Sequence, residues 1–84
     1  MKLSEFIRKR PHLIWYTKNY DGLSAESIVE ATLNYGNWDD VQTLIKILGV
    51  KKTARIFFKQ AAQKRSNYHK KTERYFALYF KKHA

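Results

Sequence analysis

Two helical patterns that meet at a glycine occupy residues 37–65, and they constrain the fold more than any other part of the sequence. The first pattern repeats apolar residues at steps of three and four, which at about 100° per residue places them on one side of a helix. These residues are Trp38, Val41, Leu44, Ile45 and Leu48. We predict that this side faces the core.

Both ends of this first helix carry end signals. Asn37 can cap the start with its side-chain oxygen, and Asp39 and Asp40 follow in the first turn, where carboxylates favour the positive end of the helix dipole. Gly49 can adopt the left-handed conformation that ends a helix, with Val50 packing back in a Schellman arrangement. A second helix is expected to begin directly afterwards.

The second pattern has one apolar side and one cationic side. The apolar side holds Ala54, Phe57, Phe58, Ala61 and Ala62. The cationic side holds Lys52, Arg55, Lys59 and Gln63. The sequence therefore predicts a helix that is buried along one face and basic along the other.

A helix, a glycine and a basic helix, as in ILGVKKTARIFF, resemble a helix-turn-helix, whose second helix enters the DNA major groove. Two positions depart from that motif. Ile45 falls where a small residue usually lets the helices cross closely, and Arg55 falls where an apolar residue usually anchors the second helix. An ordinary helical hairpin with a solvated charged face is the alternative interpretation.

Helical signals also flank the central pair. Ser4 can cap a short helix that ends before Pro11, and Ser24 opens a helix that closes at Gly36. Residues 69–82 predict a final helix with Tyr75, Phe76, Tyr79 and Phe80 along one arc, preceded by turn residues in which Ser66 or Asn67 can act as the cap. Leu13, Ile14 and Trp15 are predicted core residues, and residues 17–24 are predicted to form a loop.

All periodic segments are helical, so the fold class is predicted to be all-α. We expect a single domain over residues 1–84, because a chain of this length buries too little surface for two cores. The architecture is a compact bundle of four to five short helices with the helix-Gly-helix segment at its centre.

The composition narrows the cellular setting. The chain has no Cys, so disulfides and thiolate metal sites are excluded. The segment MKLSEFIRKR lacks the apolar core of a signal peptide, and no stretch approaches the roughly 20 apolar residues of a membrane span. We expect a cytoplasmic protein with no membrane association.

Charge is strongly segregated along the chain. Residues 1–40 hold five Lys and Arg against six acids, whereas residues 41–84 hold twelve Lys and Arg against Glu73 alone. The two halves therefore carry net charges of −1 and +11. Such asymmetry predicts a polyanionic or acidic partner for the basic half.

The sequence offers no set of residues for catalysis. His12, His69 and His83 are scattered, and no group of three ligands shares a helix face. The glycines never form a phosphate-binding loop. We therefore predict that the protein is not an enzyme, with no catalytic residues, no metal and no cofactor.

The basic segment after Gly49 is the predicted binding surface, dense enough to track a phosphate backbone. In the nucleic-acid interpretation, the cations contact phosphates and Gln60 or Gln63 faces base edges. Tyr68 either stacks a base or packs on a neighbouring helix, and Ile56 either packs against the last helix or anchors a partner. The candidate residues for binding nucleic acid or a protein partner are Lys51, Lys52, Arg55, Ile56, Lys59, Gln63, Lys64, Arg65 and Tyr68.

Nearly the whole chain, from PHLIW through EATLNYGNWDDVQTLIKILG to TERYFALYF, resembles a family of small helical proteins often encoded beside AbiEii-type nucleotidyltransferase toxins. The resemblance implies an antitoxin that binds a toxin protein. The departure is the strongly basic half of this chain, since such proteins are more evenly charged. The alternative function is a helix-turn-helix-like protein that binds DNA or RNA through the basic face of residues 51–65, and a domain cut from a larger assembly is a third. A homodimer, in which residues 26–40 of one copy meet the basic end of another, is also predicted.

Overall fold

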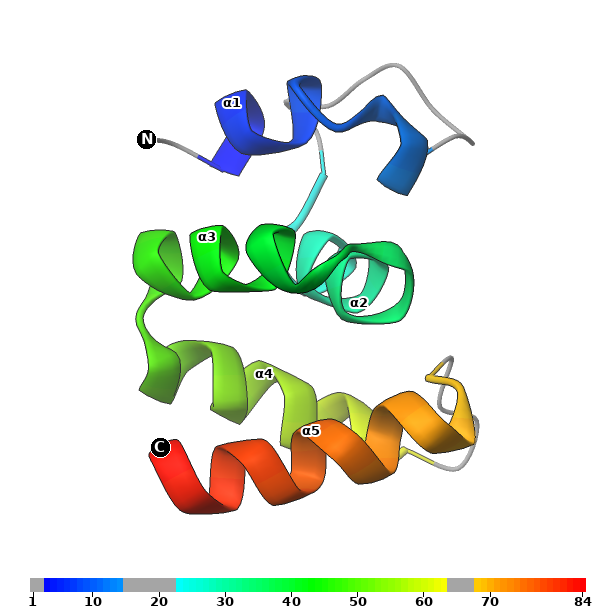
Figure 1. Cartoon of the computed structure of the whole chain (residues 1–84), viewed down its shortest axis with the longest axis vertical. Helices are drawn as coiled ribbons and strands as arrows, with labels where there is room; N and C mark the ends of the chain where they lie inside the picture. Colours follow the sequence, from blue (N-terminus) through cyan, green and yellow to red (C-terminus); the bar gives the residue numbers. More distant parts are fainter. Residues whose placement is uncertain (1–2, 15–22, 64–67) are drawn as a thin grey trace.

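Helices form the regular structure of the chain in the computed structural model, which describes residues 3–14, 23–63 and 68–84 (Figure 1). No strand occurs among these residues, so the predicted all-α bundle of four to five helices is confirmed. The elements in chain order are α1 (Leu3–Arg8), the 3-10 helix η1 (Pro11–Leu13), α2 (Ala25–Tyr35), α3 (Trp38–Leu48), α4 (Val50–Ala61) and α5 (Lys70–His83).

The helices lie in three layers that follow the order of the chain. Figure 1 shows α1 and η1 at the top, α2 and α3 in the middle, and α4 and α5 at the bottom. Helix α4 packs against α2, α3 and α5, so it joins the last layer to both helices of the middle one. Its position explains why one side of α4 is apolar and why the opposite side can be charged.

Ser24 and Asn37 cap their helices as the sequence predicts. The Ser27 N–H donates to Ser24 Oγ at 3.2 Å. The Asp40 N–H donates to Asn37 Oδ1 at 2.8 Å, and the Asn37 N–H donates back to Asp40 Oδ2 at 3.1 Å. This reciprocal capping box satisfies two backbone donors at the start of α3.

Gly49 alone separates α3 from α4. Its φ of 89° confirms the predicted need for glycine. Its ψ of 145° differs from the left-handed helical value, so the Schellman arrangement predicted with Val50 is wrong. The backbone instead leads directly into α4, whose first residue is Val50.

Gly36 ends α2 as predicted, with extended and not left-handed backbone. Its φ is −77°, a value that any residue adopts. A Cβ at this position would lie 2.7 Å from the Thr32 carbonyl oxygen and 3.0 Å from Asp40 Cβ. The close approach of α2 and α3 therefore requires glycine here.

The core is one hydrophobic cluster to which every helix contributes. Leu13 and Ile14 belong to it as predicted, whereas Trp15 lies outside the described residues. Phe57 of α4 is fully buried, with its ring centroid 5.5 Å from that of Phe80 and 6.3 Å from that of Phe76. These aromatic contacts hold α5 against α4.

Three aromatic residues on the apolar sides of their helices are partly exposed. Trp38 is 47% exposed and Tyr75 is 52% exposed, and Phe58 of α4 is also partly exposed. Each lies at the edge of the apolar side of its helix, beyond the width that the neighbouring helix covers. The prediction that the apolar sides of the two central helices face the core is therefore wrong at Trp38 and Phe58.

An ion pair that the sequence did not indicate joins the first layer to the middle one. Arg10 Nε lies 2.7 Å from Asp40 Oδ1, and Arg10 also donates to the Phe6 carbonyl oxygen at 3.1 Å. The Arg10 guanidinium lies 4.2 Å from the centre of the Phe6 ring. Asp40 thus serves both as part of the capping box and as the partner of Arg10.

Candidate functional site

Four cationic side chains form a stripe along the solvent side of α4. Lys51, Lys52, Arg55 and Lys59 are exposed, and we call them the α4 stripe. The residues that alternate with them are buried against the other helices, and these are Thr53, Ala54, Ile56 and Phe57. The amphipathic pattern of the sequence therefore places the four charges in solvent by burying the opposite face.

A groove of about 400 Å³ runs between α2 and α4 along one edge of this stripe. Its lining combines two acids with two bases and apolar or amide side chains. The lining residues are Glu26, Glu30, Arg55, Ile56, Lys59, Gln60 and Gln63. The acids of α2 therefore lie close to Arg55 and Lys59, whereas Lys51 and Lys52 lie outside the groove.

The structure separates the predicted binding residues into two groups. Lys51, Lys52, Arg55, Lys59 and Gln63 are exposed on α4 and just after it. Ile56 is only 8% exposed and belongs to the core cluster on the side facing α2. It is therefore not an exposed anchor for a partner, and the predicted packing on the last helix is replaced by packing toward α2.

Tyr68 is also buried, at 6% exposure, so the interpretation as a base-stacking ring is wrong in this conformation. Its ring packs on Phe57 with centroids 5.0 Å apart, as in the alternative interpretation. Its hydroxyl donates to Gln60 Oε1, and Gln60 Nε2 donates to the Glu26 carbonyl oxygen at 2.9 Å. This chain of hydrogen bonds uses the Gln60 amide, which was predicted to face base edges.

The electrostatic setting of Tyr68 fits a structural role. Burial raises the pKa of its phenol well above the ordinary value of 10.0, and the nearby Glu30 carboxylate raises that pKa further. The phenol therefore stays protonated and can keep donating to Gln60. The remaining candidates, Lys64 and Arg65, lie outside the described residues, as do the predicted caps Ser66 and Asn67.

The α3–α4 connection differs from a helix-turn-helix. A helix-turn-helix joins its helices by a turn of about three to four residues, whereas Gly49 is the single residue between α3 and α4. Arg55, at the position of the usual apolar anchor, is exposed. The exposed charges of α4 are therefore a basic surface without the turn geometry of that motif.

A second surface combines aromatic rings from α3 and α5, and we call it the aromatic ledge: Trp38 and Tyr75, which are about half exposed, and Tyr79, which is partly buried against the core. The Trp38 ring meets Tyr75 edge to face at 6.2 Å and Tyr79 at 5.5 Å between centroids. The Tyr75 and Tyr79 rings are nearly parallel, with an interplanar angle of 16°. Sequence reasoning missed this surface because it placed Trp38 on a core-facing side and described the two tyrosines only as part of one aromatic arc of the last helix.

One signal in the sequence could have indicated the ledge. The predicted arc of α5, from Tyr75 to Phe80, spans about 140° at 100° per residue, which is wider than one neighbouring helix covers. Phe76 and Phe80, at one edge of that arc, are buried against α4. Tyr75, at the opposite edge, is left half exposed.

The comparisons with known proteins identify no relative. None of the family models, curated proteins or solved structures compared with the chain matches it significantly. The family resemblance of the sequence therefore stays a prediction.

Two further properties of the described residues bear on the chemistry of the site. Among residues 3–14, 23–63 and 68–84, no group of three His, Asp or Glu side chains lies close enough to hold a metal ion. In the same part of the chain, no helix has the length and apolar character needed to cross a membrane.

Proposed function

We propose that this protein is a non-enzymatic nucleic-acid-binding protein that holds backbone phosphates on the α4 stripe. The observation that carries the proposal is the common exposure of Lys51, Lys52, Arg55 and Lys59 along one helix. Phosphates are the polyanion that such a row of Lys and Arg side chains binds best, because each contact releases condensed counterions.

The dimensions of the stripe fit a short run of phosphates. At about 1.5 Å per residue, the stripe from Lys51 to Lys59 is about 12 Å long. Along one strand of a duplex, phosphates recur about every 3.4 Å of helix axis, so three or four fall within that length. The number of cations on the stripe is therefore similar to the number of phosphates within reach.

The layer that carries the stripe strengthens the local field. Helices α4 and α5 together hold nine Lys and Arg residues and one acid, Glu73. Helices α2 and α3 hold four acids and one base, Lys46. A polyanion is consequently attracted to the α4–α5 layer and repelled by the middle layer.

Fluorescence anisotropy with labelled oligonucleotides, from about 50 to 200 mM salt, tests the proposal. The variant K52A/K59A removes two charges from the stripe, and K9A/K46A removes two exposed charges from elsewhere as a matched control. We expect K52A/K59A to weaken binding and to reduce the slope of log K against log salt by about 2, since each lost phosphate contact removes about 0.9. K9A/K46A should leave that slope nearly unchanged.

Two results would contradict the proposal. The first is equal weakening by both variants, which would mean that net charge alone drives association. The second is that the unmodified protein does not bind the oligonucleotides even at about 50 mM salt, the low end of the series. Either result would remove the α4 stripe as a phosphate-binding surface.

The antitoxin function implied by the family resemblance stays a second proposal. It uses the same cations against an acidic protein face, and its direct test is complex formation with a nucleotidyltransferase toxin. A nanomolar complex that persists in K52A/R55A/K59A would favour the antitoxin role, since the stripe would then be dispensable. A complex abolished by nucleic acid would favour the first proposal.

A further inference from the structure

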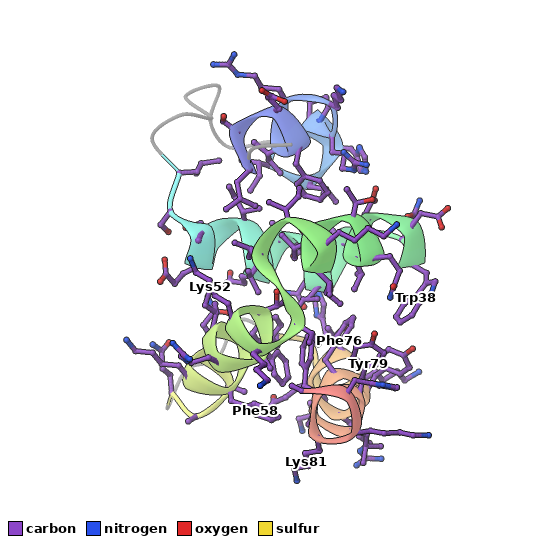
Figure 2. All side chains as sticks on the ribbon, turned by 90° about the vertical axis from the view of Figure 1, so that its left-hand side faces the viewer. Trp38, Lys52, Phe58, Phe76, Tyr79 and Lys81 are labelled. Carbon is purple, nitrogen blue, oxygen red and sulfur yellow. The ribbon has the colours of Figure 1, made fainter. Side chains whose placement is uncertain are left out.

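The aromatic ledge lies apart from the α4 stripe. Figure 2 shows Lys52 on one side of α4, and Trp38 and Tyr79 on the other side of the molecule. Substitutions in the ledge can therefore be tested while the stripe is intact. The ledge also has a different chemistry, because it exposes aromatic rings as well as charge.

The rings of the ledge hold one another in place. Trp38 meets both tyrosines edge to face, with interplanar angles of 82° and 86°, and the two tyrosines lie 6.5 Å apart between centroids. The tyrosines are one helical turn apart on α5, whereas Trp38 starts α3. Since two helices fix the three rings, their orientation exists before any ligand binds.

Cations flank the ledge on the same face of α5. Lys71 precedes Tyr75 by four residues and Lys82 follows it by seven, so all three lie along one side of the helix. All three are exposed. Within α5, every residue of which is described, Glu73 is the one acid, and its place two residues before Tyr75 turns it about 160° away. The α5 side of the ledge is thus bordered by cations, whereas on the α3 side Trp38 is followed by the exposed acid Asp39.

We propose that the aromatic ledge stacks the bases of single-stranded nucleic acid, with Lys71 and Lys82 contacting the flanking phosphates. This inference rests on the proposed function, which supplies nucleic acid as the ligand. It adds that the nucleic acid is single-stranded and that it binds at a second surface. Exposed aromatic rings bordered by cations are the arrangement by which proteins bind single strands without reading their sequence.

Single strands fit the ledge better than the alternative ligands. Bases in a duplex stack on one another and offer no free face to Tyr75 or Trp38, whereas bases in a single strand do. A protein partner would have to bring acidic groups to offset Lys71 and Lys82 around its apolar contact. The nucleic-acid backbone brings that negative charge with every base.

Binding of matched oligonucleotides tests the inference. One is an oligothymidylate of about 12 nucleotides, and the other has the same backbone with abasic sites throughout, so that they differ only in the bases. We expect the oligothymidylate to bind about tenfold more tightly, the gain typical of one stacked base. Y75A should remove most of that difference.

Two control variants separate stacking from general surface effects. Y75F keeps the ring and should keep the preference for bases. L78A removes another exposed apolar side chain from the same face of α5 and should also keep it. Since Tyr75 and Leu78 are both largely exposed, neither substitution should unfold the protein.

Tryptophan fluorescence supplies an independent measurement. Stacking on Trp38 should quench its emission when oligothymidylate binds, but not when the abasic strand binds. In W38F, which leaves Trp15 as the remaining tryptophan, this quenching should be lost.

The outcomes distinguish the two proposals. Equal binding of the base-containing and abasic strands would overturn the proposal that the ledge stacks bases, and it would leave the proposed phosphate binding by the α4 stripe in place. Absence of binding to either strand would overturn both. A protein partner whose binding is lost in Y75A, with the preference for bases unchanged, would assign the ledge to that partner and overturn the inference.

Discussion

The Asp40 side chain stabilises both the start of its own helix and the contact between two layers of helices. Its Oδ2 accepts from the Asn37 N–H at the start of α3, and its Oδ1 lies 2.7 Å from Arg10 Nε. His12 Nε2 also lies 3.9 Å from Oδ2. The carboxylate therefore links the first layer to the middle layer through a charged hydrogen bond that is largely shielded from solvent.

We expect Asp40→Asn to lower the free energy of unfolding by about 1–3 kcal/mol, because the hydrogen bond with Arg10 loses its charged acceptor. Asp39→Asn is the matched control, since it makes the same change at an exposed position in the same helical turn. The control should cost less than about 1 kcal/mol, the typical worth of a carboxylate at a helix start. Urea unfolding of the two variants measures both values, and equal losses would contradict the role assigned to the ion pair.

Tyr68 gives a prediction that depends on pH. At pH 7 we expect Tyr68→Phe to lower the free energy of unfolding by about 1 kcal/mol, because Gln60 loses its donor. Folding raises the pKa of this phenol, so its contribution is complete below the unfolded pKa of about 10 and is lost as the pH rises above it. The difference between the unmodified protein and the variant should therefore shrink above about pH 10.

Urea unfolding at pH 7, 9 and 10.5 measures this trend. Tyr75→Phe, which removes a hydroxyl from a half-exposed ring, is the matched control for the loss of one phenol. A difference that stays constant over the whole pH range would mean that the buried hydroxyl of Tyr68 does not contribute in the way proposed.

At the scale of the helices, two glycines position α3 between its neighbours by different means. Gly36 allows α3 to start close to the end of α2, because a Cβ there would lie 3.0 Å from Asp40 Cβ of α3 and 2.7 Å from the Thr32 carbonyl oxygen in the last turn of α2. Gly49 has open space around it but needs a positive φ. The same substitution should therefore fail for different physical reasons at the two positions.

We expect Gly49→Ala to lower the free energy of unfolding by about 1–3 kcal/mol, the usual cost of an L-residue held in such a conformation. The helical circular dichroism should be unchanged, since an added Cβ meets nothing within 4 Å. Gly36→Ala is the comparison, because there the neighbouring helices must move apart. Urea unfolding measures the loss in Gly49→Ala, for which the m-value should be unchanged. If Gly49→Ala is as stable as the unmodified protein, the turn can relax to a backbone conformation without a positive φ, and the prediction is wrong.

At the scale of the whole molecule, charge follows the layers. The acids of α2 and α3 lie between the basic first layer and the strongly basic last layer. Glu26 and Glu30 share a groove with Arg55 and Lys59 of the same chain. These acids and bases therefore already offset one another within one molecule, which weakens the attraction between the acidic layer of one copy and the basic layer of another.

The homodimer predicted from this charge segregation stays a prediction. If the acidic layer of one copy meets the basic layer of another, the mass measured by light scattering should rise at about 20 mM salt and return to the monomer value at about 300 mM, where charges are screened. E26Q/E30Q should weaken this association. A monomer at every salt concentration would exclude the dimer and would show that the net charge of +10 keeps the molecules apart.

The sequence by itself determined the local structure. Side-chain spacing placed α2 to α5 within about two residues of their observed bounds, and Ser24, Asn37 and Gly49 marked helix ends because capping and positive φ depend on adjacent residues only. The cations of the α4 stripe were also predictable, since the amphipathic pattern fixes which face of α4 is polar.

Only the tertiary structure decided which apolar and aromatic side chains are covered. Periodicity gives the direction of a side chain but not the width of the helix that packs over it, so Trp38 and Tyr75 remain partly exposed while Ile56 and Tyr68 are buried. The pair of Arg10 and Asp40, thirty residues apart, likewise depends on how α1 sits on α3. The two candidate surfaces differ accordingly: the α4 stripe follows from one helix, whereas the aromatic ledge exists because two helices meet.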